Sequence, residues 1–159
     1  MPRTARPRST AADPAWLQLD RQLCFALYSA SLAMTKLYKP LLQPLGLTYP
    51  QYLAMLVLWE RDGIVVSELG QRLMLDSGTL TPLLKRLQSA GLITRQRRQQ
   101  DEREVDIRLT DAGLALRDKA SGIPECLAQC MQLPFAQMQS LRDELKRLTR
   151  QIQLSPSED

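Results

Sequence analysis

Residues 75–95 read Leu75-Asp-Ser-Gly-Thr-Leu-Thr-Pro-Leu-Leu-Lys-Arg-Leu-Gln-Ser-Ala-Gly-Leu-Ile-Thr-Arg95, and this stretch decides the fold. Asp76 or Ser77 can cap a first helical turn, and Gly91 is typical of a helix end. One face of the predicted helix is apolar: Leu80, Leu83, Leu84, Leu87 and Ala90. The other carries hydroxyls, cations and an amide: Ser77, Thr79, Thr81, Lys85, Arg86 and Gln88. This face suits a helix in a DNA groove, but the pattern alone also fits an ordinary amphipathic surface helix.

The composition narrows the chemistry open to the chain. Its 159 residues suffice for one domain, and a net charge of +4 permits nucleic-acid binding without requiring it. It has no histidine, which excludes Ser-His-Asp catalysis and histidine-containing zinc sites. Three cysteines without CxxC spacing argue against a secreted disulfide scaffold, and no apolar run approaches the ~20 residues of a membrane span. We therefore expect a cytoplasmic protein with no membrane anchor, metal or cofactor.

The first third of the chain predicts an arm and a long helix. Residues 1–12 are rich in Arg, Pro, Ser and Thr, which is typical of a disordered basic arm. From Asp13-Pro14 onward apolar residues recur at spacings of three and four, so a helix is expected from residue 13. Pro40 should bend or end this helix, and the segment closes at residue 46.

The central third predicts a buried helix and then a helix-turn-helix. Residues 49–61 follow the cap residue Thr48 and are apolar on nearly every face, which places them in the core. Residues 64–66 are β-branched, as in an edge strand, and Ser67 is a plausible cap for a short helix. A tight turn separates that helix from the helix of the opening stretch, and this arrangement is typical of a helix-turn-helix.

The residues after Gly91 change to the period of β-strands. Residues 92–95 and 105–109 predict a hairpin, and the second strand alternates apolar and charged side chains. The polar loop between them carries Arg97, Arg98 and Arg103. A cationic hairpin directly after a helix-turn-helix predicts the wing of a winged helix, whereas an isolated hairpin of this kind is equally well explained as a solubilising tip.

The remainder predicts two more helices and a tail. Thr110 should cap a helix that continues towards Ile123-Pro124, where a break is expected. Cys126 and Cys130 follow at i, i+4 spacing. After Pro134 a heptad-like seam suits packing against a partner helix: Met138, Leu141, Leu145, Leu148 and Ile152. Residues 155–159 form a polar tail.

The order of these elements resembles the MarR family of dimeric winged-helix regulators, and in particular its organic-hydroperoxide-sensing, OhrR-type members. The likeness extends from about Leu19 to Leu148. The segments that carry it are Leu23-Cys-Phe-Ala-Leu-Tyr28, Thr48-Tyr-Pro-Gln-Tyr52, Leu75 to Leu87, and Asp101-Glu-Arg103 in the wing. It implies a mainly α fold, with a winged helix-turn-helix over 62–109 that includes a small antiparallel β wing, and dimerisation helices over 13–46 and 110–154.

The resemblance implies a cytoplasmic repressor, not an enzyme, that binds a pseudo-palindromic operator in double-stranded DNA as a homodimer. The candidates near bases are Ser77, Thr79, Thr81 and Gln88, and those near phosphates are Lys85 and Arg86. In the wing, Arg97, Arg98 and Arg103 would enter the minor groove, and Asp101 would orient the tip. Pro82 in the helix interior predicts either a helix start near Thr79 or a local kink.

The resemblance also implies that Cys24 senses an organic hydroperoxide. Tyr28 and Tyr38 would stabilise its thiolate, and oxidation to sulfenic acid and then to a disulfide with Cys130 or Cys126 of the partner would release the DNA. Tyr38 follows Cys24 by 14 residues, or ~21 Å along one helix, so a contact between them must join two chains. Composition alone favours a buried structural cysteine at this position.

Two other functions remain open from the sequence. A thiol peroxidase would also use Cys24, but the helix-turn-helix would then be unexplained. A MarR-type regulator that responds to a non-covalent phenolic ligand would keep its response after replacement of all the cysteines.

Overall fold

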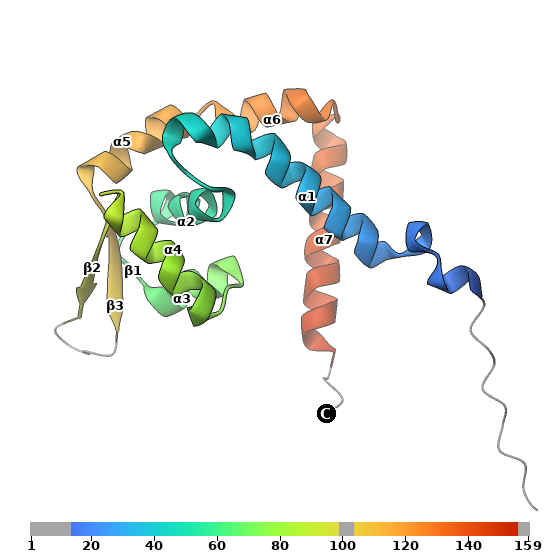
Figure 1. The fold of residues 1–159 in the computed structure, drawn as a ribbon, viewed down its shortest axis with the longest axis horizontal. Helices are drawn as coiled ribbons and strands as arrows, with labels where there is room; N and C mark the ends of the chain where they lie inside the picture. Colours follow the sequence, from blue (N-terminus) through green and yellow to red (C-terminus); the bar gives the residue numbers. More distant parts are fainter. Residues whose placement is uncertain (1–13, 99–103, 156–159) are drawn as a thin grey trace, which may run out of the picture.

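The structure is a computed structural model that describes residues 14–98 and 104–155. The expected basic arm, the wing residues Asp101 and Arg103, and the tail beyond Ser155 lie outside the described residues. The described part is mainly helical with one small sheet, as expected from the sequence (Figure 1).

Helices and strands follow one another in the order of a winged helix-turn-helix flanked by long helices. In chain order they are the 3-10 helices η1 (Pro14–Leu17) and η2 (Leu19–Arg21), then α1 (Leu23–Leu42), η3 (Gln43–Leu45), α2 (Tyr49–Glu60), β1 (Ile64–Val65), α3 (Val66–Leu73), α4 (Ser77–Ser89), β2 (Ile93–Arg97), β3 (Val105–Leu109), α5 (Asp111–Ala120), α6 (Ile123–Met131) and α7 (Phe135–Leu154). None of the helices in the described ranges is long and apolar enough to cross a membrane.

The first long helix begins ten residues later than the sequence pattern predicted, at Leu23 rather than at residue 13. Gln18 and Gln22 have extended backbones, with ψ of 131° and 116°. Gln18 separates η1 from η2, and Gln22 separates η2 from α1. Trp16 and Leu17 in those turns are 72% and 84% exposed. With so little apolar surface buried, tertiary packing does not hold this segment in one continuous α-helix. Pro40 lies in the last turn of α1, close to the expected end.

Helix α2 is the centre of the core, as its apolar sequence predicted. Ala54, Met55 and Leu58 are at most 1% exposed, and the helix contacts α1, α3, α4 and α5. At its start the backbone N–H of Thr48 donates to the side chain of Gln51 at 2.8 Å. At its other end the indole N–H of Trp59 donates to the carbonyl of Gly113 in α5 at 2.9 Å. These bonds hold α2 between the winged helix and the helices that flank it.

The three strands form an antiparallel sheet in the order β1-β3-β2, so β1 is an edge strand as predicted. Ile64 pairs with Ile107 and Ile93 pairs with Leu109. All three isoleucines are at most 1% exposed, so this face of the sheet packs on the helices. The hairpin of β2 and β3 is the predicted wing, and it follows α4 directly in Figure 1.

The two helices of the helix-turn-helix are α3 and α4. Helix α3 begins at Val66 with Val65 as its cap residue, so the cap predicted at Ser67 is wrong: this serine lies in the first turn. In α4 a carboxylate oxygen of Asp76 accepts a hydrogen bond of 2.8 Å from the backbone N–H of Thr79, as one of the two expected caps. Gly91 has a φ of +73°, the left-handed conformation expected after the helix.

Pro82 lies inside α4, which begins at Ser77, so the alternative of a helix start near Thr79 is wrong. A proline in this place has no N–H to bond the carbonyl of Gly78, four residues earlier. The surrounding turns hold nevertheless, because the cap bond at Asp76 and the buried side chains of Leu80 and Leu84 fix the helix on both sides of the proline.

The C-terminal helices include the break that the sequence predicted. The hydroxyl of Thr110 accepts a hydrogen bond from the backbone N–H of Gly113 at 3.0 Å and so caps α5, and Ser121 and Gly122 separate α5 from α6. Helix α7 descends beside the rest of the molecule in Figure 1. The seam residues Leu141, Leu145 and Ile152 are 49%, 37% and 63% exposed, so this apolar face lies open in a single chain.

Candidate functional site

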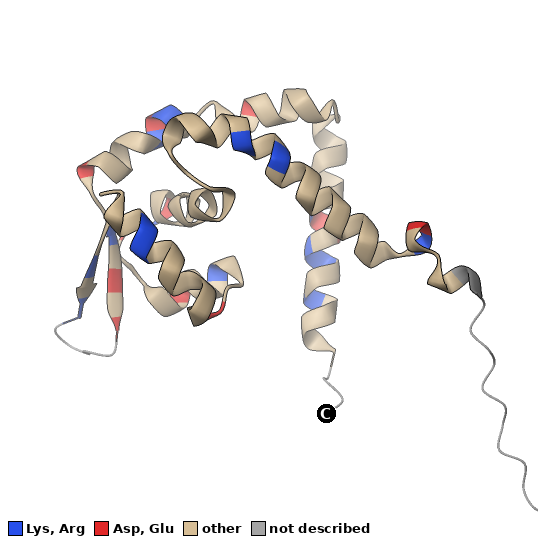
Figure 2. Ribbon diagram, viewed as in Figure 1, with Lys and Arg blue, Asp and Glu red and all other residues tan. Residues whose placement is uncertain are grey.

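Helix α4 presents its polar face to solvent. The apolar residues Leu80, Leu83, Leu84 and Leu87 are buried against the core. All the side chains that the sequence assigned to DNA are exposed: Ser77, Thr79, Thr81, Lys85, Arg86 and Gln88. Figure 2 shows a cationic band on α4 and another on β2 beside it. The structure therefore places the predicted contact residues on one accessible face.

A groove of about 390 Å³ separates α4 from the wing. Its hydroxyl groups come from both helices of the helix-turn-helix, namely Ser67, Ser77 and Thr81. The wing contributes Arg95, Glu104 and Val105. The remaining lining residues are apolar: Val65, Val66 and Leu84.

Gln88, one of the predicted DNA contacts, is bonded to the wing. The guanidinium Nε of Arg95 on β2 donates to Oε1 of Gln88 at 2.7 Å. Sequence patterning did not find Arg95, because a strand arginine seven residues after Gln88 has no periodic relation to the helix. The bond ties the end of α4 to the first strand of the wing.

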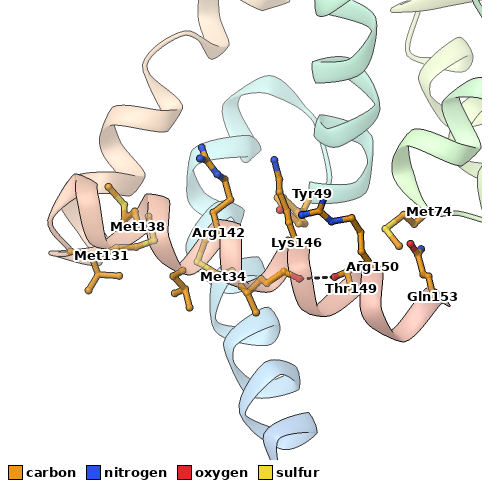
Figure 3. A pocket seen from close by; sticks show the side chains of 13 residues that line it. Met34, Tyr49, Met74, Met131, Met138, Arg142, Lys146, Thr149, Arg150 and Gln153 are labelled. Atoms are coloured by element: carbon orange, nitrogen blue, oxygen red, sulfur yellow. Dashed lines mark hydrogen bonds between the residues drawn. The ribbon is translucent and has the colours of Figure 1, made fainter. Parts of the chain in front are cut away.

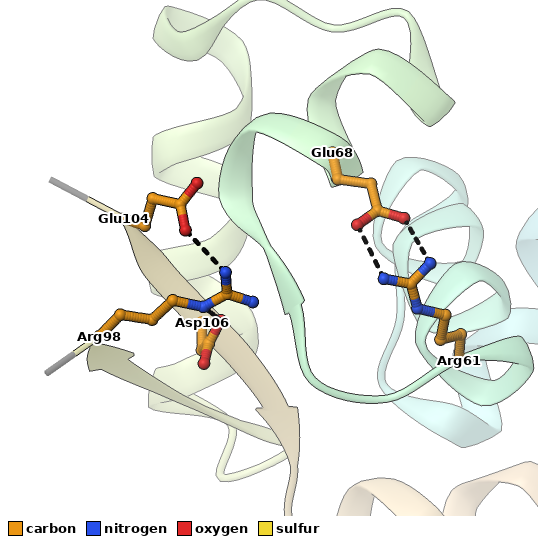
Figure 4. A network of polar contacts seen from close by, with 5 residues as sticks. All are labelled: Arg61, Glu68, Arg98, Glu104 and Asp106. Atoms are coloured by element: carbon orange, nitrogen blue, oxygen red, sulfur yellow. Dashed lines mark hydrogen bonds and ion pairs between the residues drawn. The ribbon is translucent and has the colours of Figure 1, made fainter. Parts of the chain in front are cut away.

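Arg98, predicted to enter the minor groove, bonds two carboxylates at the tip end of the wing strands (Figure 4). Its Nη1 donates to Glu104 and its Nε donates to Asp106, each at 2.7 Å. The hydrogen bond to Asp106, followed by the attraction of both carboxylates, raises the pKa of the Arg98 guanidinium above its ordinary value. Arg97, the neighbouring predicted contact, is exposed on β2.

Figure 4 also shows a second ion pair, between Arg61 after α2 and Glu68 in α3, with an N–O distance of 3.0 Å. Both nitrogen–oxygen bonds of the pair are drawn, so the arginine and carboxylate meet side by side. This exposed pair connects the core helix to the first helix of the helix-turn-helix, and it was not predicted.

The three cysteines are exposed free thiols in a single chain. Cys24 is the second residue of α1, while Cys126 and Cys130 lie on α6. In Figure 1 the first turn of α1 is well separated from α6. The structure therefore does not bring Cys24 to either cysteine within one protomer. Among the residues in 14–98 and 104–155, no group of three metal-ligating side chains is present.

The predicted thiolate partners Tyr28 and Tyr38 have different surroundings. Tyr28 is 61% exposed, one turn after Cys24 on α1. Tyr38 is half-buried, and its ring lies 4.4 Å from that of Tyr49 and 5.7 Å from that of Tyr52. Burial, and then the neighbouring phenols, raise the pKa of Tyr38 to about 12. Tyr49 was missed as a site residue, although it stands in the quoted segment Thr48-Tyr-Pro-Gln-Tyr52.

A larger groove of about 830 Å³ lies beside α7 (Figure 3). One wall carries three cations at four-residue spacing, Arg142, Lys146 and Arg150. The rest is mainly apolar and rich in methionine, with Met34, Met74, Met131 and Met138. Tyr49 also reaches this groove, so the groove adjoins the tyrosine cluster.

Comparison with known proteins connects these features to a family. A family model described as transcriptional regulator SarA/Rot matches residues 36–119, which include the whole winged helix-turn-helix. The organic hydroperoxide resistance transcriptional regulator of Bacillus subtilis is 56% identical over 108 residues, or 68% of this chain and 74% of that protein. The HTH-type transcriptional regulator TtmR of Methylorubrum extorquens is 46% identical over 134 residues, which cover 84% of this chain and 69% of that protein.

A solved structure agrees with these sequence relatives. Reduced AbfR bound to DNA superposes with a TM-score of 0.73 at 34% identity, covering 87% of this chain and 97% of that one. AbfR is a protein of Staphylococcus epidermidis. At 87% of this chain, the match extends beyond the winged helix-turn-helix to the helices that flank it. The chain therefore belongs to the MarR family of winged-helix transcriptional regulators, in the branch of the organic-hydroperoxide regulators.

Proposed function

We propose that the protein is a dimeric repressor that binds operator DNA when Cys24 is reduced and releases it when an organic hydroperoxide oxidises Cys24. The observation that carries the proposal is the pairing of an exposed cysteine on α1 with an exposed polar face on α4 in one regulator of this branch. The name of the Bacillus relative supports the oxidant, and the DNA-bound state of reduced AbfR supports the DNA. As a DNA-binding regulator, the protein would act in the cytoplasm and would have no catalytic turnover.

In the proposed dimer, α4 of each protomer enters a major groove, and the two-fold axis matches a pseudo-palindromic operator. Ser77, Thr79 and Thr81 lie near base edges. Lys85 and Arg86 contact phosphates, and Arg97 and Arg103 of the wing contact the minor groove, with Asp101 orienting the tip. Arg98 instead holds the two wing strands together through Glu104 and Asp106.

The redox step begins with the Cys24 thiolate of one protomer. Its sulfur attacks a peroxide oxygen, the O–O bond breaks, and an alcohol leaves after taking a proton, so that sulfur is oxidised to sulfenic acid and the peroxide is reduced. A thiol of the partner, Cys130 or Cys126, then attacks the sulfenic sulfur, and water leaves as the disulfide forms.

The tyrosines have a defined role in this proposal. Tyr38 is protonated at neutral pH because its pKa lies near 12, so its phenol can donate a hydrogen bond to a thiolate. Tyr38 and Cys24 of one chain are too far apart to meet, so the donor is the Tyr38 of the partner, with Tyr49 stacked against it. Tyr28 of the cysteine's own helix is the second donor.

Disulfide formation supplies the change of shape. For the disulfide to form, the α-carbon of Cys24 must come within ~7 Å of the α-carbon of the partner's cysteine. In the proposed DNA-bound dimer the two lie further apart than this. Whether Cys130 or Cys126 reacts, the terminal helices must move, and this motion changes the spacing of the two α4 helices. A pseudo-palindrome with fixed half-site spacing is then released.

The test measures the release of DNA after cumene hydroperoxide is added, with an electrophoretic mobility shift as the readout. We expect the wild-type complex to dissociate and the Cys24→Ser complex to persist. The Cys126→Ser and Cys130→Ser variants, run on non-reducing gels, identify the resolving cysteine by loss of the cross-linked dimer. Release of the Cys24→Ser complex by peroxide would contradict the proposal.

A second candidate function rests on the groove beside α7. Its three cations and methionine-lined wall suit an apolar anion such as a phenolate or aromatic carboxylate. A regulator of this kind would be released from DNA by the ligand without oxidation. Its test is DNA release by salicylate in a variant with Cys24, Cys126 and Cys130 all replaced by serine.

A further inference from the structure

The groove between α4 and the wing is lined by an arginine of the wing, Arg95, which the helical spacing of α4 could not reveal. The bond from Arg95 Nε to Gln88 Oε1, at 2.7 Å, holds the guanidinium between the end of α4 and β2. A directed bond through Nε fixes the plane of the guanidinium. Less side-chain freedom is then lost when the group binds an anion.

The sheet register explains why Arg95 faces this groove. Arg95 pairs with Ile107, which is fully buried, so both side chains lie on the face of the sheet that packs towards the helices. Arg108 pairs with Thr94 one residue along, so it lies on the opposite face. The hairpin therefore presents Arg95 towards α4 and Arg108 away from it.

DNA geometry assigns an occupant to the groove. Adjacent major and minor grooves of a duplex are separated by one sugar–phosphate strand. When α4 lies in the major groove and the wing in the minor groove, that strand must pass between α4 and the wing. Arg95 lines this space together with the hydroxyl of Ser67, which has no role near base edges. Guanidinium and hydroxyl groups are the usual donors to phosphate oxygens.

The acidic residue in the lining is compensated. Glu104 would repel a phosphate, but its carboxylate is ion-paired with Arg98 at 2.7 Å. The groove then offers the phosphate strand the guanidinium of Arg95 and the hydroxyl of Ser67, with the carboxylate charge of Glu104 balanced.

We propose that Arg95 binds a phosphate of the operator strand that crosses between the two grooves, and that Gln88 positions Arg95 instead of reading a base. The inference rests on the proposed DNA binding and deepens it. Arg95 becomes a contact residue that the sequence did not reveal, and Gln88 becomes a positioning residue.

The experiment uses the reduced full-length protein and duplexes that wild-type protein selects from a random-sequence library. Affinity is measured by fluorescence anisotropy over a range of KCl concentrations. We expect Arg95→Ala to weaken binding about ten-fold and to make the slope of log affinity against log salt shallower by ~2 per dimer, since each phosphate contact contributes ~0.9. Arg108→Ala removes the same charge from the other face of the hairpin, and we expect it to change the slope much less.

Gln88 is tested on its own with base-substituted duplexes. We expect Gln88→Ala to weaken all of them by a similar factor of about three, with the base preference unchanged, because a positioning residue carries no sequence information. Arg95→Lys retains the charge and therefore the salt slope, but loses affinity because it has no Nε to bond Gln88. Circular dichroism confirms that each variant is folded.

The possible outcomes distinguish a failure of the roles proposed for Arg95 and Gln88 from a failure of the proposed DNA binding. Equal effects of Arg95→Ala and Arg108→Ala on the salt slope would overturn the phosphate contact. A change of preference at one base pair in Gln88→Ala would overturn the positioning role. Failure of the wild-type protein to enrich any duplex would contradict the DNA binding itself.

Discussion

The ring of Tyr38, near the end of α1, lies 4.4 Å from the ring of Tyr49, the first residue of α2, with an angle of 37° between their planes. Tyr52 adjoins Tyr38, and Trp59 meets Tyr52 edge to face at 6.2 Å. An aromatic row thus runs from α1 along the core helix α2. Ionisation of a phenol in this row would place a charge in a poorly solvated site beside two other phenols.

The first prediction is a loss of stability in alkali that depends on Tyr38. Its folded-state pKa of about 12 lies above the ordinary value of 10.0, so the protonated phenol contributes stability fully below pH 10, and that contribution is lost as pH rises through 12. Tyr38→Phe should reduce this alkaline loss, whereas Tyr28→Phe, which changes an exposed ring, should not. Urea unfolding between pH 8 and 12 measures both, and parallel curves for wild type and Tyr38→Phe would contradict the prediction.

The second prediction concerns the cap of α5. The hydroxyl of Thr110 accepts from the backbone N–H of Gly113 at 3.0 Å and donates to the carbonyl of Gly91 at 2.6 Å, so it joins the end of α4 to the start of α5. Thr110→Ala should lower the free energy of unfolding by ~1–2 kcal/mol in urea titrations. Thr110→Ser keeps the hydroxyl and should retain most of the stability. A serine variant as unstable as the alanine variant would show that the methyl group, not the cap, matters.

The third prediction concerns close packing at Gly113. A Cβ atom at this position would lie 2.1 Å from the carbonyl oxygen of Leu92, which is backbone and cannot move aside cheaply. Gly113→Ala should therefore destabilise the protein by ~3 kcal/mol or more, at the upper end of the range for overpacking. Gly122→Ala is the matched control, because it also adds one methyl group but meets nothing within 4 Å. Equal thermal midpoints for the two variants would refute the packing argument.

The fourth prediction concerns the compensated carboxylate at the wing. Arg98→Ala leaves Asp106 without its partner, and it leaves Glu104 unpaired in the groove proposed for the phosphate strand. Affinity for the selected duplexes should fall about ten-fold, because like charges face each other across the interface.

Neutral replacements of Glu104 and Asp106 show whether Arg98 balances these carboxylates or contacts DNA directly. The triple variant Arg98→Ala, Glu104→Gln, Asp106→Asn should recover most of the affinity, because the repulsion is removed together with the arginine. A direct DNA contact by Arg98 gives the opposite result in the same anisotropy titration, namely no recovery.

The sequence predicted helices correctly where a local feature, either apolar periodicity or a capping side chain, determined them. The apolar period placed α2 and the buried face of α4, and the polar side chains of Asp76 and Thr110 marked two helix starts. It failed for residues 14–21, where an apolar pattern suggested a helix but little of the apolar surface is buried. It also missed the bond of Arg95 to Gln88, because that bond depends on how β2 packs beside α4. It missed the partners of Arg98 because bonds across a hairpin depend on strand register, which residue spacing does not reveal.

The bond between Trp59 and Gly113 gives the chain a built-in optical probe. The two tryptophans differ sharply: Trp16 is 72% exposed in a 3-10 turn, while the half-buried Trp59 is fixed by its indole N–H to α5. Emission from Trp59 should be blue-shifted and resistant to quenching by acrylamide, and that from Trp16 red-shifted and readily quenched. With Trp16 replaced by phenylalanine, the remaining signal follows the contact between α2 and α5 in real time, without any added label.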